Sequence, residues 1–377
     1  MTKSSKHLTV CKTGIALSIL AMSAGAYAQS TGTVGTNSTP QQRTDAFAGG
    51  EGGSAGGSGG STTPLAATIS NAIVGPAVGA AAGGSANVAS FTAGGPVAGS
   101  SPSIRRFALS GQKGEAAAGG GQAWNAWFNV AQNNVAWSFA PVNASGRVNA
   151  ATVGVDYTFS NKVILGLALS GDRTRLGLNG SIVTGNMSGS GTTGTLYLGV
   201  PIDQNWTFDA GLGTGRTKVD LNVNNFAGSL SDRRTVGNLG VTYRAAAMGN
   251  WNLSGRAAYI GVSDRLGAFT LTNGALTSNV NSASVNIGQL RVGGQAAYNA
   301  GSVTPYVGVT YVYDVSAPGA TTLGGQTSAR DRDAFNLQLG LGFRASNSIY
   351  GNIQYSTEQS RKEVKNDQIM FSLGVRF

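Results

Sequence analysis

The sequence predicts an all-β fold. The predicted architecture is a 12-stranded antiparallel transmembrane β-barrel. We expect a low-complexity, mostly disordered segment to precede the barrel, and this segment could supply a helix to the lumen. Residues 367–377 place apolar side chains at every second position and end on Phe377. Similar alternating segments recur from residue 122 onward. Gly is frequent, at 58 of 377 residues, and charged residues make up only 11%. Strands that face lipid on one side and a polar interior on the other show this alternation.

The N-terminus predicts a secretory signal peptide over residues 1–28. Lys3, Lys6 and Lys12 give a positive start, and the apolar run 14–22 is too short to remain as a membrane helix. The small-x-small motif at 26–28 predicts cleavage before the next residue. Formal charge would fall from +10 to about +7, because three lysines and no acids are lost.

Cleavage would leave a mature chain without thiol or imidazole chemistry. Cys11 and His7 are the only residues of their types, and both lie in the signal. We therefore predict no catalytic, cofactor-binding or metal-binding residues, no cofactor, and no enzymatic activity. Asp331 and Asp333 are close enough to suggest paired carboxylates. Their alternation with arginines is typical of a solvated loop instead.

Residues 29–121 form a Gly/Ser/Ala-rich zone with little bulky apolar surface. Such a composition cannot offset the entropy of ordering a core. Residues 49–60 have the composition of a flexible linker. The stretches 66–82 and 103–118 are more apolar, and either could form a helix, although each is interrupted by Gly or Pro.

Residues 122–377 are predicted to form the barrel. Short turns alternate with longer polar links such as 265–283 and 316–332, and an even number of strands places both barrel ends on one side of the membrane. The twelve predicted strands are 122–131, 147–158, 162–175, 187–200, 206–219, 233–245, 251–264, 284–299, 303–315, 333–345, 348–358 and 367–377.

The two faces of these strands differ in chemistry. The outward sets are apolar, as in Leu165, Leu167 and Leu169, whereas the inward sets are Gly, Thr, Asn, Asp and Arg, which predicts a wet interior. The inward charges either grip a linker and bias ion passage, or pair with one another. The predicted lumen-facing charges are Asp156, Asp209, Arg244, Arg256, Arg291, Asp314, Arg344 and Arg376.

Two further sets follow from the same alternation. Inward glycines leave room for a plug or relieve crowding in a curved sheet; they are Gly166, Gly199, Gly211, Gly240, Gly308 and Gly340. Aromatic residues near the short turns predict a periplasmic girdle with rings in lipid. That girdle comprises Tyr157, Phe159, Trp206, Phe208, Tyr243, Trp251, Tyr298, Phe343, Tyr350 and Phe377.

Several blocks resemble the autotransporter β-domain family: residues 123–127, the hairpin block 152–170, residues 249–254 and the closing strand. The resemblance covers about 122–377. It implies a monomeric barrel that carries an N-terminal passenger to the surface and holds a linker helix in its pore. It also implies that the last strand is read by the assembly machinery, and the residues for that signal are Phe371, Leu373, Val375 and Phe377.

These observations predict an outer-membrane barrel of a Gram-negative bacterium that translocates or displays its short N-terminal segment. The alternatives are an anion-leaning diffusion channel and a structural or adhesive surface protein. Expected partners are outer-membrane lipid and lipopolysaccharide, the barrel-assembly machinery and periplasmic chaperones. Nucleic acid is not expected. Residues 29–121 contain no Asn-Asn pair, so we expect no passenger self-cleavage.

Overall fold

The computed structural model describes residues 123–245, 249–274, 276–316, 322–323, 326–328, 332–346 and 348–377. The predicted signal peptide, the zone 29–121 and its candidate lumen helix lie outside these residues. Asp331 also lies outside them. Within the described part of the chain, no helix is long and apolar enough to cross a membrane.

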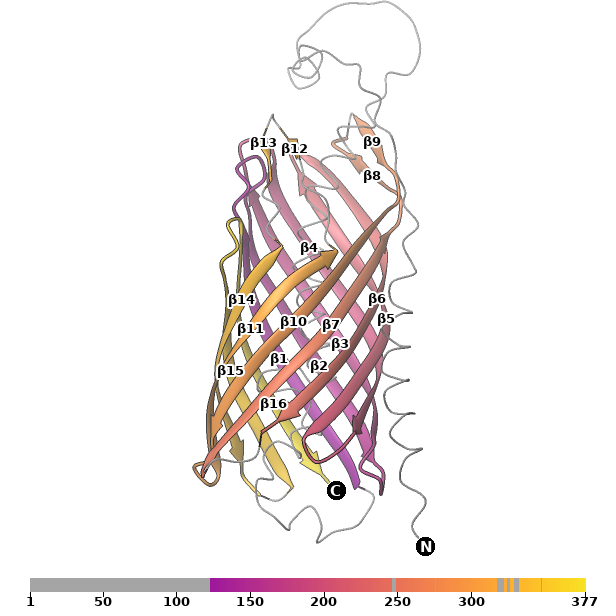
Figure 1. Cartoon of the computed structure of the whole chain (residues 1–377). Helices are drawn as coiled ribbons and strands as arrows, with labels where there is room; N and C mark the ends of the chain where they lie inside the picture. Colours follow the sequence, from indigo (N-terminus) through magenta and orange to yellow (C-terminus); the bar gives the residue numbers. More distant parts are fainter. Residues whose placement is uncertain are drawn as a thin grey trace, which may run out of the picture. The chain divides into compact units, whose positions relative to one another are not determined.

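Twelve long antiparallel strands form a closed wall, as predicted (Figure 1). Neighbours in sequence pair throughout, and β1 pairs with β16 from Asn125↔Arg376 to Trp137↔Val364, which closes the barrel. Closure leaves this wall without an unpaired edge, as a lipid environment requires. The wall strands are β1 (Ala123–Trp137), β2 (Ala144–Thr158), β3 (Ile164–Asn179), β4 (Thr184–Pro201), β5 (Trp206–Val223), β6 (Phe226–Arg244), β7 (Trp251–Leu266), β10 (Ala283–Tyr298), β11 (Val303–Ser316), β14 (Asp333–Arg344), β15 (Ile349–Gln359) and β16 (Val364–Arg376).

Two small hairpins lie in connections that were predicted as loops. β8 (Phe269–Thr272) and β9 (Thr277–Val280) pair within the link between β7 and β10, and β8 meets β6 at Ala227↔Thr272. β12 (Thr322–Leu323) and β13 (Gln326–Thr327) pair within the link between β11 and β14. Strands this short carry too few alternating positions to be recognised in the sequence.

The predicted strand ends are accurate at the short-turn end and too short at the opposite end. The sequence predicted a polar link between residues 219 and 233, but β5 runs to Val223 and β6 begins at Phe226. Only Asn224 and Asn225 connect them, with φ of 49° and 66°, as a tight two-residue hairpin requires. The strands continue beyond the apolar band, where outward side chains are polar and the alternation fades.

The outward face carries an apolar band of the kind that a bilayer covers. Leu167 and Leu339 are each 59% exposed, and exposed apolar residues occur on strands all round the wall. So large an apolar surface marks a membrane contact. Members of the band include Val153, Val155, Leu165, Leu169, Leu196, Leu212, Leu290, Val292, Val307, Val309, Leu337, Leu341, Ile353 and Ile369.

Aromatic side chains pair across strands at the short-turn end. Trp206 and Tyr243 lie with ring centroids 4.9 Å apart, and Trp251 and Tyr298 lie 5.2 Å apart. The prediction was wrong for Tyr350, which is buried on the inward face, where its hydroxyl donates to Asn125. Tyr350 shares its strand face with inward Asn352, so alternation along β15 turns its ring away from lipid.

Candidate functional site

The lumen is the candidate functional site, because the inward positions of the strands gather the buried polar side chains. The first wall strand begins and the last wall strand finishes at the short-turn end of the barrel. There, the amides of Trp124 and Phe377 each donate to the other residue's carbonyl at 3.1 Å. Figure 1 shows the C-terminus at this lower end of the barrel.

A hydrogen-bonded network lines the lumen near the short turns. The indole of Trp127 donates to the Tyr197 hydroxyl at 2.8 Å, and that hydroxyl donates to Asp156 at 2.9 Å. The Asn125 amide donates to the same carboxylate at 3.0 Å, and Tyr350 donates to Asn125. Asp156, a predicted lumen-facing charge, is thus 1% exposed and is held by neighbouring side chains.

Two inward glycines make room for aromatic rings on the adjacent strand. A Cβ at Gly166 would lie 2.3 Å from Cζ of Tyr197, its direct partner across β3 and β4. A Cβ at Gly340 would lie 2.1 Å from the ring of Tyr306, its partner across β11 and β14. At these two positions, glycine leaves space for a tyrosine ring of the adjacent strand. This supports the interpretation that the inward glycines relieve crowding within the sheet.

Asp209 and Arg256 form a buried ion pair in the half of the wall nearer the short turns. Nη2 of Arg256 donates to Asp209 at 2.7 Å, and Nη1 contacts the other carboxylate oxygen. Nη1 also donates to Thr242 at 3.2 Å, and Asn238 donates to Asp209 at 3.4 Å. The pair links β5 to β7 across β6, so it braces three strands. Bidentate geometry of this kind satisfies both charges.

A second buried cluster, which the sequence analysis missed, lies nearer the opposite end. Nε and Nη2 of Arg234 donate to Asp264 at 3.0 and 3.1 Å, and Nη1 donates to Asp172 at 3.3 Å. Asp232 is buried beside them, and neither of its carboxylate oxygens has a hydrogen-bond partner within the described structure. Asp264 shares its strand face with Arg256, so alternation along β7 could have identified it.

The remaining predicted charges divide into two groups. Asp314 accepts from Gln289 at 2.8 Å, and Gln289 accepts from Arg291 at 2.7 Å, so the structure brings Asp314 and Arg291 together. Arg244, Arg344 and Arg376 occupy inward positions at the short-turn ends of their strands. The Arg344 side chain is exposed, and the other two are half-buried.

Arg361, in the connection between β15 and β16, is another missed residue. It donates to Asp314 at 2.7 Å and pairs with Glu358. Burial lowers the pKa of the Arg361 guanidinium, but the hydrogen bond that it donates to Asp314 and the negative charge of Glu358 outweigh this effect. The pKa is therefore raised above its ordinary value, and Arg361 remains a cation.

Including the missed residues changes the charge balance of the lumen. The predicted set contained more arginines than acids. The structure adds four acids, Asp172, Asp232, Asp264 and Glu358, but only two arginines, Arg234 and Arg361. Among the described residues, inward acids and arginines thus become equal in number, and ion pairs join several of them inside the wall.

The prediction of a wholly wet interior was wrong for the end opposite the short turns. There the inward positions are apolar and form one buried cluster. It was missed because these residues lie at strand ends that the sequence analysis assigned to links or left at the margins. The cluster includes Phe139, Val142, Leu176, Leu178, Val183, Met187, Val219, Leu221, Val223, Leu230, Leu266, Phe269 and Leu271.

The site contains hydrogen-bonded and ion-paired wall residues and a water-excluding apolar end. Across the described ranges, no group of His, Cys, Asp or Glu side chains could hold a metal ion. The arrangement can brace the wall and line a passage.

Comparisons with known proteins agree on one family. The model of the family described as "Autotransporter beta-domain" matches residues 121–356, more than half of the chain. The comparison with curated proteins gave no match.

Three solved structures share the fold. The NalP translocator domain from Neisseria meningitidis is 14% identical, with a TM-score of 0.58 over 68% of this chain and 89% of its own. The β-domain of the Bordetella autotransporter BrkA is 14% identical, with a TM-score of 0.54 over 68% and 100%. The transport unit of AIDA-I from Escherichia coli is 11% identical, with a TM-score of 0.50 over 67% and 90%. At these identities the likeness shows the fold alone.

Proposed function

This chain belongs to the autotransporter β-domain family, and from that membership we propose that its barrel carries residues 29–121 to the cell surface and anchors them there. The protein is an outer-membrane autotransporter-type barrel of a Gram-negative bacterium. In this proposal residues 1–28 are removed as the signal peptide, 29–121 are a short passenger and linker, and 122–377 are the translocator.

One observation supports the proposal above the others. The wall closes by pairing β1 with β16, and the first strand begins at the short-turn end beside Phe377. Short turns face the periplasm in outer-membrane barrels. A segment that precedes β1 therefore starts on the periplasmic side. In this proposal, the N-terminal segment crosses the membrane through the lumen of the barrel.

Partners and chemistry follow from the same architecture. The closed wall leaves no free edge for pairing with a second copy, which favours a monomer. Insertion would depend on periplasmic chaperones and the barrel-assembly machinery, with the closing strand as the signal that they read. We also propose that the barrel acts without catalysis, because the chain's only His and Cys lie in the predicted signal.

A tag placed next to Thr31 tests the proposal in intact cells. If the segment is displayed, an antibody binds the tag and added protease removes it. The matched control carries the same tag in the short turn at Asp203 and Gln204, where it should stay protected until the outer membrane is permeabilised. A tag near Thr31 that behaves like the turn tag would place the segment in the periplasm and overturn the proposal.

A further inference from the structure

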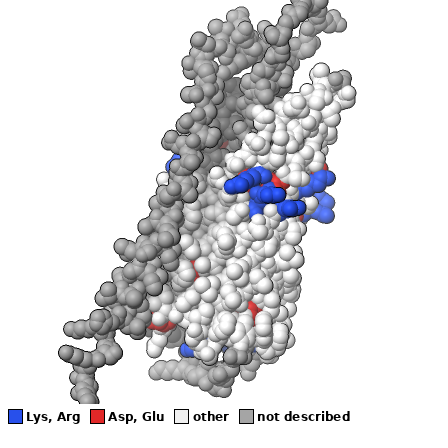
Figure 2. Space-filling model, turned by 90° about the vertical axis from the view of Figure 1, so that its right-hand side faces the viewer, with Lys and Arg blue, Asp and Glu red and all other residues white. Residues whose placement is uncertain are grey.

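A belt of cations surrounds half of the outer wall just beyond the apolar band. Arg173 and Arg175 on β3, Arg216 on β5, Arg233 on β6 and Arg265 on β7 are all outward and exposed. Arg147 on β2 and Lys218 on β5 extend the belt. Figure 2 shows Lys and Arg side chains gathered at one level of the wall, with mostly white surface below them.

The belt places like charges directly opposite one another. Arg216 pairs in register with Arg233, and Arg233 pairs with Arg265, so three arginines lie side by side across β5, β6 and β7. Like charges in this arrangement destabilise a sheet. Among the residues that the structure describes, none of the three forms an ion pair, and the nearby Asp220 carboxylate lies 3.5 Å from Lys218. A bound anion from outside the chain would offset the repulsion among these three arginines.

These arginines border a groove that could hold such an anion. The groove has a volume of about 640 Å³, and the hydroxyl-bearing residues Ser190, Thr192 and Ser231 line it beside the three arginines. Buried Asp232 also borders it from the inner side. Guanidinium groups bind phosphate through paired hydrogen bonds, and hydroxyls add further donors.

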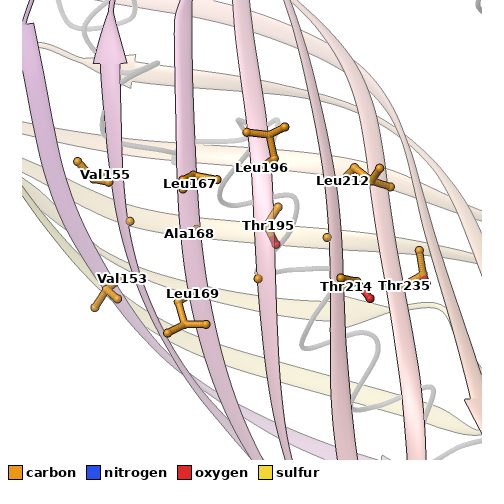
Figure 3. Close-up of a pocket in the computed structure, with 13 residues that line it drawn as sticks. Val153, Val155, Leu167, Ala168, Leu169, Thr195, Leu196, Leu212, Thr214 and Thr235 are labelled. Atoms are coloured by element: carbon orange, nitrogen blue, oxygen red, sulfur yellow. The ribbon is translucent and has the colours of Figure 1, made fainter.

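An apolar hollow adjoins the groove on the same strands. Its volume is about 810 Å³, and Leu167, Leu196 and Leu212 flank it, with Thr214 and Thr235 at its edge (Figure 3). Gly194 faces outward and lines this hollow, and a Cβ added to Gly194 would meet no atom within 4 Å. Thr214 lies two residues from Arg216 on β5, or about 7 Å along the strand. An arginine-bordered groove and an apolar hollow thus follow one another along β4, β5 and β6.

We propose that the groove and the hollow together form a binding site for a phosphorylated glycolipid of the outer leaflet, of the lipopolysaccharide class. Its phosphate would bind Arg216, Arg233 and Arg265, and an acyl chain would occupy the hollow around Gly194. The belt lies toward the end opposite the periplasmic turns, which is where the outer leaflet meets the wall. The site is separate from the lumen and does not depend on which passenger the barrel carries.

Binding to the full-length purified protein in non-ionic detergent tests the site. The probes are diphosphoryl lipid A, fully dephosphorylated lipid A and inorganic phosphate, measured by native mass spectrometry or by thermophoresis. We expect Arg216→Gln/Arg233→Gln to weaken diphosphoryl lipid A binding roughly tenfold or more, because charge-assisted hydrogen bonds are lost. The dephosphorylated probe should bind wild type as weakly as diphosphoryl lipid A binds this variant.

A matched pair separates a site from a diffuse positive surface. Arg147 and Arg175 also oppose each other directly, on β2 and β3, but neither lines the groove. Arg147→Gln/Arg175→Gln removes the same charge and should change affinity less than the groove pair does. Equal losses in the two variants would overturn the proposal in favour of unspecific attraction. Heat-modified migration on gels verifies that both variants are folded.

Gly194→Phe distinguishes a lipid from a free anion. The hollow has room for the ring, so the barrel should fold, while an acyl chain is excluded. We expect weaker binding of diphosphoryl lipid A and unchanged binding of inorganic phosphate. If Gly194→Phe leaves lipid A binding unchanged and inorganic phosphate competes fully, the groove binds free anions and the lipid site is wrong.

Discussion

At the residue scale, the wall is held together by polar side chains that bind one another between adjacent strands and across an intervening strand. Asp156 accepts from Tyr197 and Asn125, and Asp209 pairs with Arg256. Ion pairs in buried settings are costly to break, because removal of one partner leaves the other desolvated and alone. These side chains therefore fix strand register as well as lumen chemistry.

Removal of the Arg256 cation should destabilise the barrel more than removal of the whole pair. Arg256→Gln is expected to lower the free energy of unfolding by about 3 kcal/mol, because Asp209 stays buried without its cation. Asp209→Asn/Arg256→Gln should recover most of that loss. Urea unfolding of refolded, detergent-bound protein, followed by tryptophan fluorescence, measures both.

The exposed pair of Lys218 and Asp220 provides the control for that measurement. Its side chains are 64% and 57% exposed, so Lys218→Gln should cost at most about 1 kcal/mol. A double variant at Asp209 and Arg256 that is as unstable as Arg256→Gln alone would show that the loss does not come from an uncompensated Asp209 charge.

At the element scale, the closing strand β16 and the residue that follows it contain two phenylalanines in different environments. The Phe377 backbone pairs with Trp124, whereas its side chain is 72% exposed. Phe371 instead packs against Phe128, with ring centroids 5.7 Å apart. We therefore separate a recognition role for Phe377 from a packing role for Phe371, although both belong to the proposed assembly signal with Leu373 and Val375.

Phe377→Ser should reduce the amount of barrel in the outer membrane while leaving its stability nearly unchanged. The reason is that backbone pairing with Trp124 survives the substitution. Membrane fractionation measures the first effect, and urea unfolding in detergent measures the second. Phe371→Ser is the comparison, expected to lose stability because its ring contacts are removed. Normal membrane levels of Phe377→Ser would exclude the terminal ring as an assembly signal.

At the scale of the whole molecule, the lumen has two chemically different halves. The half near the short turns is polar and internally paired, and the opposite half is lined by an apolar cluster. Apolar constrictions hinder ion passage by dewetting, and paired charges exert little net field. Both features disfavour the anion-leaning channel that the predicted excess of inward arginines suggested.

Planar-bilayer recordings of residues 122–377 should therefore show little preference between anions and cations. The reversal potential in a salt gradient is expected near zero, because inward acids and arginines balance. Asp209→Asn, which removes one acid, should shift the potential toward anion selectivity and acts as the positive control. Strong anion selectivity of the wild-type barrel would contradict this expectation and favour the anion-leaning diffusion channel.

Much of the fold could be predicted from residues alone. Alternation identified all twelve wall strands, and their short-turn ends agree with the structure because aromatics and turn residues mark that boundary. The opposite ends could not be placed, since polar outward residues such as Ser188 and Ser229 hide the period of two there. The hairpin of β8 and β9 was missed because strands of four residues carry too few alternating positions.

The candidate site was predicted less completely than the wall. Alternation assigned Asp209, Arg256 and Asp314 to the inward face, but it could not say which charges meet. Arg234 was missed although it shares its strand face with the predicted inward residues Gly240 and Arg244, and alternation does not say which charges it meets. Register resolves this: Arg233 lies opposite Arg216 and Arg265 on the outside, while Arg234 reaches Asp264 and Asp172 inside.

The amino-acid sequence by itself determined that the chain spans a membrane with twelve strands and closes on its C-terminal strand, because alternation and strand count are local properties. Only the tertiary structure decided which side chains become neighbours, because register brings together residues that are distant in the chain. The pairing of Asp209 with Arg256 and the row of three outward arginines both arise in that way.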